Sequence, residues 1–122
     1  MTSARKKNEK PESEKFSTAV SSELKGEFKT EFKSDVPAIY AHWRGHAQDK
    51  KAEVRAVFVA ENVTDVASDY EIDESKAVAP TSNSNVTFTL SRPEGGWAPG
   101  NYRVEFFLDD TPAGVAKFKI LK

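Results

Sequence analysis

Hydrophobic and polar residues alternate with a period of two along much of the chain, which is typical of β-strands that bury one face. The segment 38–45, AIYAHWRG, places Ile39, Ala41 and Trp43 on one side. The segment 52–62, AEVRAVFVAEN, is apolar at both even and odd positions, which indicates a central strand covered on both faces. The same criteria predict further strands at 68–73, 85–91, 101–109 and 113–121.

Clusters of Asp, Asn, Ser, Gly and Pro separate these segments and supply turns. Strands recur about every ten to fifteen residues, and no convincing helix lies between them. This spacing predicts an all-β fold for residues 16–122, an antiparallel β-sandwich of about seven strands. The short loop DDTPAG, residues 109–114, predicts that the last two strands form an antiparallel hairpin.

The segment 16–34 is ambiguous between strand and helix. Gly26 and the alternation in EFKTEF, residues 27–32, favour strands. Both readings stay open, because five apolar residues also recur four positions apart, as on one face of a helix. These residues are Phe16, Val20, Leu24, Phe28 and Phe32.

Residues 1–15 contain only one apolar residue, Ala4, besides the initiator Met. A segment with so little to bury cannot offset the entropy lost on ordering, so we expect a disordered tail or linker. Such a tail could anchor the domain to a membrane or to a neighbouring domain.

The composition limits the kinds of partner and of chemistry that the chain can have, and it bears on the cellular compartment. The 18 basic and 19 acidic residues nearly cancel, so no overall field favours nucleic acid. The absence of Cys removes disulfides and thiolate chemistry. No apolar run is long enough for a transmembrane segment or a signal peptide core. If a signal peptide was removed, the protein is extracytoplasmic, in the periplasm or at the cell surface; otherwise its location stays open.

The stretch PGNYRVEFFL predicts a structural corner ahead of the penultimate strand. Pro99 and Gly100 form a turn, and Tyr102 stands at the head of an alternating strand. In immunoglobulin-like sandwiches a Tyr in this place bonds through its hydroxyl to the backbone of the preceding corner, while its ring enters the core.

Three longer stretches extend this pattern: FKSDVPAIYAHWRG, FTLSRPEGGWAPGNYRVEFFLDD and AKFKI. Together they resemble the immunoglobulin-like domains of bacterial exported proteins and lipoproteins of unassigned function. The resemblance implies an immunoglobulin-like sandwich and an exported location, and it transfers no active site. The chain departs from the pattern at Asp110, where the family often has Gly in the last turn. Because Asp tolerates a left-handed conformation, we expect the hairpin to form.

The sequence shows no nucleophile elbow, phosphate loop or dinucleotide fingerprint, and we predict no catalytic, cofactor-binding or metal-binding residues. His42 and His46 would lie about 13 Å apart along one strand, too far for one zinc ion. A weak calcium site formed by Asp65, Asp69 and Asp73 is an alternative to a solvated edge strand.

Aromatic residues are the better lead to a binding surface. Trp97 lies in a glycine-rich loop, where it could stack on a sugar or anchor a partner, or fold back to plug the end of the sandwich. Tyr40, His42 and Arg44 share the face opposite the core. Phe107 lies opposite the core side of its strand, so its exposure would mark a contact face and its cover a structural role.

These features favour a non-catalytic, immunoglobulin-like accessory or interaction module of an exported bacterial protein, which recognises a partner by a sheet face or by end loops. One alternative is a carbohydrate-binding module that uses Trp97 with Tyr40 or Tyr70. Another is a hydrolase fragment without its catalytic domain. The sequence leaves open whether the partner is a protein or a glycan, and we expect a monomer.

Overall fold

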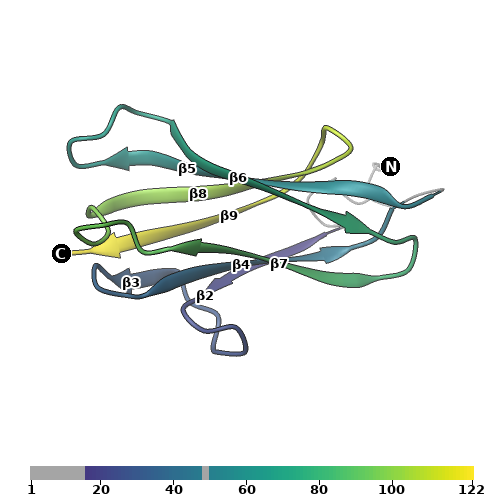
Figure 1. Cartoon of the computed structure of the whole chain (residues 1–122), viewed down its shortest axis with the longest axis horizontal. Coiled ribbons are helices and arrows are strands. Elements are labelled where there is room, and N and C mark those ends of the chain that lie inside the picture. Colours follow the sequence, from purple (N-terminus) through teal and green to yellow (C-terminus); the bar gives the residue numbers. More distant parts are fainter. Residues whose placement is uncertain (1–15, 48–49) are drawn as a thin grey trace, which may run out of the picture.

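The computed structural model describes residues 16–47 and 50–122, so the tail predicted at 1–15 lies outside the described residues. Across these residues the chain is all-β, as predicted, with eight strands and no helix. The strands form two sheets that pack face to face (Figure 1). Their order is β2-β4-β7 in the three-stranded sheet and β3-β9-β8-β5-β6 in the five-stranded sheet. The bounds are β2 Ser17–Ser21, β3 Glu31–Lys33, β4 Ala38–Gly45, β5 Ala52–Val63, β6 Tyr70–Ala79, β7 Ser84–Ser91, β8 Gly100–Leu108 and β9 Thr111–Leu121.

The ambiguous segment 16–34 forms two short strands in different sheets, so the helical alternative is wrong. Val20 on β2 and Phe32 on β3 are buried, whereas Leu24 and Phe28 between them are exposed. The four-residue spacing therefore does not mark one buried helical face. β2 pairs with β4 antiparallel, but β3 pairs with β9 in parallel, which corrects the expectation of purely antiparallel strands.

The core lies between the two sheets and receives the alternate residues of their central strands. On β4, Ile39 and Trp43 point inward and are almost completely buried. The Trp43 indole Nε1 donates a hydrogen bond to the carbonyl of Ala113 at 3.0 Å, which links the three-stranded sheet to β9. Phe88 on β7 packs against Phe106 on β8 with 6.1 Å between the ring centroids. Large aromatic side chains thus hold the two layers together.

The predicted edge strand at 68–73 is longer than its pattern indicated. β6 continues through ESKAVA to Ala79, and its later residues pack inward at Ala77 and Ala79. β6 and β7 are joined by residues 80–83 and separate toward the opposite end of the molecule (Figure 1).

The β8–β9 hairpin turns through Asp109 and Asp110, whose φ angles are 48° and 70°. Two left-handed residues between paired Leu108 and Thr111 are the arrangement of a tight hairpin turn that matches strand twist. The carboxylate of Asp109 accepts a hydrogen bond from the backbone N–H of Glu53 at 2.9 Å. Asp110 therefore takes a left-handed conformation in the turn, and the expected hairpin forms.

Candidate binding groove

A corner built by Tyr102 forms one end of the sandwich. The Tyr102 hydroxyl donates to the carbonyl of Ala98, and its ring stacks on Phe118 with centroids 5.1 Å apart. Burial raises the pKa of this hydroxyl. Gly100 is required beside it, because its φ is 147° and an added Cβ would lie 2.5 Å from the carbonyl oxygen of Asn62. The Pro99 carbonyl accepts a hydrogen bond at 3.1 Å from the backbone N–H of the residue that follows β5.

Trp97 belongs to the corner and not to an exposed surface. Its side chain is only 3% exposed and lies edge-on to Tyr102, with 6.0 Å between the ring centroids. The indole Nε1 donates to the carbonyl of Val36 at 2.8 Å, and the Trp97 backbone N–H donates to the carbonyl of Ser34 at 3.0 Å. These bonds hold the ring inward, so Trp97 packs the corner and exposes little surface for stacking, although it contributes to the lining of the adjacent groove.

A groove of about 420 Å³ lies beside this corner, between β6 and the end of β7. Its lining comes from Ala60 and Val63 on β5, from β6 and β7, from Tyr102 on β8, and from the loop 92–99, which includes Trp97. Nearly all of its lining is apolar; apart from tyrosine hydroxyls, the polar side chains are those of Asp73 and Ser91. The volume falls within the range of small-molecule and side-chain binding sites, about 300–1,000 Å³.

Two side chains of β6 leave apolar surface in water at the rim of this groove. Tyr70 is 56% exposed and Ile72 is 36% exposed, and both line the groove. Sequence reasoning considered Tyr70 only as a helper of Trp97 and missed Ile72. The available signal was that both fall in an edge strand with no second strand predicted to cover them.

The stripe of Tyr40, His42 and Arg44 lies on the outer face of the three-stranded sheet, opposite Ile39 and Trp43. Tyr40 and His42 are half-buried and Arg44 is exposed. The Arg44 guanidinium donates to the side-chain oxygen of Asn85 on β7 at 3.1 Å. This face is therefore polar and largely engaged in hydrogen bonds between neighbouring strands.

His42 is held between two hydroxyls on this face. Ser21 Oγ lies 2.8 Å from Nε2, and Thr87 Oγ1 lies 3.0 Å from Nδ1. Since Ser21 donates its proton to the carbonyl of Glu23 at 2.6 Å, it accepts from His42, which places the imidazole proton on Nε2. Burial lowers the pKa of His42. Ser21 is completely buried, so this pair does not present a nucleophile to a substrate.

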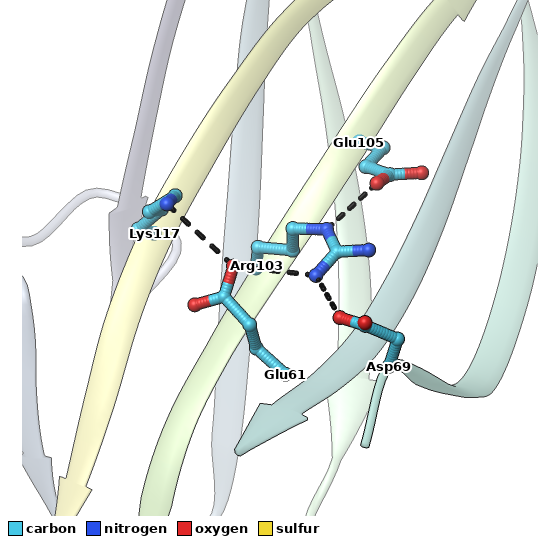
Figure 2. A network of polar contacts seen from close by, with 5 residues as sticks. All are labelled: Glu61, Asp69, Arg103, Glu105 and Lys117. Carbon is cyan, nitrogen blue, oxygen red and sulfur yellow. Dashed lines mark hydrogen bonds and ion pairs between the residues drawn. The ribbon is translucent and has the colours of Figure 1, made fainter.

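An ionic network covers the outer face of the five-stranded sheet (Figure 2). Arg103 donates to Glu105 at 2.6 Å, to Asp69 at 2.7 Å and to Glu61 at 3.2 Å, and Lys117 lies 3.5 Å from Glu61. The hydrogen bonds that Arg103 donates to Asp69 and, second in effect, to Glu105 raise the pKa of its guanidinium. Each of these five charged side chains therefore has a partner of opposite charge within the protein.

Phe107 on the same face is half-buried, and within the described residues a charged side chain covers its ring. The Arg55 guanidinium lies over its ring at 4.4 Å from the centroid and pairs with Glu74 at 3.0 Å and Asp110 at 3.4 Å. The nearby Val57 is buried although it points outward. The stems of charged side chains cover this central strand from outside, which explains its apolar pattern on both faces.

Several of the residues considered for metal binding are engaged elsewhere. Asp69 pairs with Arg103, and Asp73 accepts the backbone N–H of Glu74 at 2.8 Å. His46 bonds to the carbonyl of its neighbour at 2.9 Å, away from the partners of His42. Across residues 16–47 and 50–122 no group of three or more His, Cys, Asp or Glu side chains is placed to hold a metal ion, and no helix could cross a membrane.

Comparison with known proteins gives a likeness of fold. No protein-family model matches the chain, and no curated protein resembles its sequence. A mutant β-glucosidase from Listeria innocua, solved in complex with laminaribiose, is similar with a TM-score of 0.53 and 14% identity over 88% of this chain. A β-glucosidase from Erythrobacter marinus has a TM-score of 0.52 and 12% identity over 87%. The chain spans only 16% and 15% of those two proteins.

The two outer faces and the groove therefore differ in what they offer a ligand. Hydrogen bonds and ion pairs within the protein already engage much of the polar surface on both faces. The groove instead presents apolar surface in contact with water beside two sheet edges. Burial of that surface by a ligand would be favourable at about 25 cal/mol per Å² of apolar area. The groove is accordingly the best candidate site.

Proposed function

We propose that this chain is a non-catalytic, immunoglobulin-like interaction module of an exported bacterial protein, which binds a protein partner in the groove between β6 and β7. The immunoglobulin-like assignment rests on two packed sheets and on the bond from Tyr102 to Ala98 at the corner, the position that the sequence resemblance picks out. The exported location rests on that resemblance alone.

The observation that carries the proposal is the exposed apolar rim of the groove. Tyr70 and Ile72 stand on an edge strand at the mouth of an apolar groove, where a solvated strand would ordinarily carry polar side chains. Exposed apolar surface beside a formed groove is typical of interaction sites. The fold likeness to short segments of larger proteins supports an accessory role, because such a segment forms only a small share of those chains.

Carbohydrate binding is the weaker candidate for the same groove. The exposed ring of Tyr70 could stack on a sugar. However, sugar hydroxyls need several hydrogen-bonding partners, and the lining offers few besides Asp73 and Ser91. The buried ring of Trp97 also removes the aromatic platform on which this alternative chiefly rested.

Titration of the ¹⁵N-labelled protein followed by NMR tests the groove as the binding site. Benzyl alcohol serves as the apolar probe and laminaribiose as the sugar probe. We expect benzyl alcohol to shift the amides of residues 70–73 and 90–98, and laminaribiose to shift none. Tyr70→Ala should weaken the response, whereas Val78→Ala, which changes a 62% exposed residue outside the groove on the same strand, should not.

The proposal fails if benzyl alcohol shifts only amides on the outer faces of the sheets or shifts no amides at all. Saturable shifts around Tyr70 with laminaribiose but not with benzyl alcohol would favour the carbohydrate alternative.

A further inference from the structure

The two sheets have different widths, and the difference falls beside the groove. Within the described residues β6 is the last strand of the five-stranded sheet, and β7 is the last strand of the three-stranded sheet. Each pairs on one side only, with β5 and β4 respectively. The outer edge of each strand therefore has backbone N–H and C=O groups without a partner strand.

The position next to β7 is the place where an added strand would bury the most apolar surface. Leu90 and Ser91 at the end of β7 form one wall of the groove, and Tyr70 and Ile72 of β6 form the other. A fourth strand in the layer of β7 would extend beneath β6 and cover these exposed side chains. Successive side chains of a strand point to opposite faces. Every second side chain of the added strand would therefore point toward Ala60 in the groove.

The two segments that supply most of the groove lining are rich in acidic residues, of which Asp73 lines the groove itself. The segments 63–73 and 90–98 contain one basic residue, Arg92, and five acidic residues: Asp65, Asp69, Glu71, Asp73 and Glu94. Apart from Asp69, which pairs with Arg103, these segments contain four carboxylates and one guanidinium. This excess attracts a cationic ligand and disfavours an anionic one, and its effect weakens as salt is added.

We propose that the groove binds an extended basic segment of a protein partner, which adds a strand to the free edge of β7. Alternate apolar side chains of the segment enter the groove, and Lys or Arg side chains between them lie near the acidic rim. The inference rests on the proposed function and specifies the partner. Backbone hydrogen bonds to an edge strand supply affinity in such complexes, and the pockets for alternate side chains supply selectivity.

An extended segment fits this site better than a helix does. A helix satisfies its own backbone groups and is about 10–12 Å wide with side chains, so it could not pair with β7. A strand lies about 4.8 Å from its neighbour and brings both backbone bonds and alternate side chains to the site.

The test uses a synthetic peptide of about seven residues, a typical strand length, in which Lys and Val alternate. A Lys–Ser peptide keeps the charge, a Glu–Val peptide keeps the apolar pattern, and a fourth peptide carries N-methyl groups at alternate residues that block strand pairing. We expect the Lys–Val peptide to shift the amides of residues 86–91 and 70–73. The other three should bind at least about tenfold more weakly, a difference of about 1.4 kcal/mol.

Two protein variants locate the binding energy. Ile72→Lys places a cation at the groove wall and should weaken binding of the Lys–Val peptide about tenfold or more. Val78→Lys makes the same change in charge on the same strand outside the groove and is the matched control. Circular dichroism checks that both variants stay folded, which we expect because both positions are exposed.

Equal binding of the Lys–Val and Lys–Ser peptides would overturn the inference, since charge alone would then account for binding. Equal binding of the N-methylated peptide would also overturn it, because strand addition would be unnecessary. If benzyl alcohol enters the groove and no peptide does, the proposed groove function stands and only the peptide partner is wrong. If neither probe shifts groove amides, both proposals fail.

Discussion

Replacement of Tyr102 by Phe removes one hydroxyl from the corner and leaves the ring in place. The ring would still stack on Phe118 and meet the edge of Trp97, so the packing of the core changes little. The lost interaction is the hydrogen bond to the Ala98 carbonyl. A typical hydrogen bond contributes about 0.5–1.5 kcal/mol, and a buried acceptor left without a partner costs about 1–3 kcal/mol.

Because Ala98 is half-buried, some water can reach its carbonyl, and we expect a loss of about 1–1.5 kcal/mol for Tyr102→Phe. Urea unfolding with a slope of about 1.5 kcal/mol per M would show a fall in the midpoint of somewhat less than 1 M. Tyr102→Ala also removes the ring and should lose about 3–5 kcal/mol, the usual range for deletion of a buried aromatic side chain.

The matched control is Tyr70→Phe, which removes a hydroxyl from an exposed ring and should change the free energy of unfolding by less than about 0.5 kcal/mol. A local readout comes from hydrogen exchange of the Trp97 indole N–H, which the corner holds against Val36. Its exchange should accelerate in Tyr102→Phe. A loss no larger than that of Tyr70→Phe, with unchanged indole exchange, would show that the hydroxyl does not hold the corner.

Three other changes test the backbone and the outer face. Gly100→Ala should lower the free energy of unfolding in urea by about 2–4 kcal/mol, because the added Cβ would meet the backbone of β5. Gly95→Ala is the control: its added Cβ has open space, so only the positive φ should matter, at a cost of about 1 kcal/mol. Equal losses for the two variants would exclude the clash at Gly100. Asp110→Gly removes the strain of a left-handed Asp and should raise the free energy of unfolding by about 0.5–1 kcal/mol, which raises the melting temperature by several degrees. A lower melting temperature would contradict the turn assignment. Burial lowers the pKa of folded His42, so the unfolded state takes up a proton first and stability should fall as pH drops below about 6.5. His42→Gln should reduce this dependence when urea midpoints are compared between pH 5 and 8, and His46→Gln, which leaves the bonds of His42 in place, should preserve it.

The sequence predicts those strands in which apolar and polar residues alternate clearly. Burial of every second residue leaves its pattern within the strand's own sequence, so it can be recognised without knowing the rest of the fold. Ile39 and Trp43 follow this pattern and enter the core as their spacing indicated. The β8–β9 hairpin is predictable for a similar reason, since a short loop with Asp109 and Asp110 restricts the connection to a tight turn.

The assignment of strands to sheets is not local, and the sequence did not predict it. β3 contributes one buried residue, Phe32, and three residues are too few to show a period. The middle of β6, residues 74–76, is polar because its outer side faces water, so alternation is hidden there. The groove depends on how far β6 and β7 separate, which is set by sheet width and twist. The orientation of Trp97 depends on the carbonyl of Val36, which lies far away in the sequence.

The parallel pairing of β3 with β9 also has a consequence for biosynthesis. Phe32 pairs in register with Ile120, and its ring packs against Phe118, so β3 completes its contacts only with the last strand. A nascent chain leaves the ribosome from its N-terminus, and non-local pairings form slowly. A chain halted before β9 emerges would expose Phe32 and the unpaired edge of β8. We therefore expect the domain to complete folding only once residues through Leu121 have emerged from the ribosome.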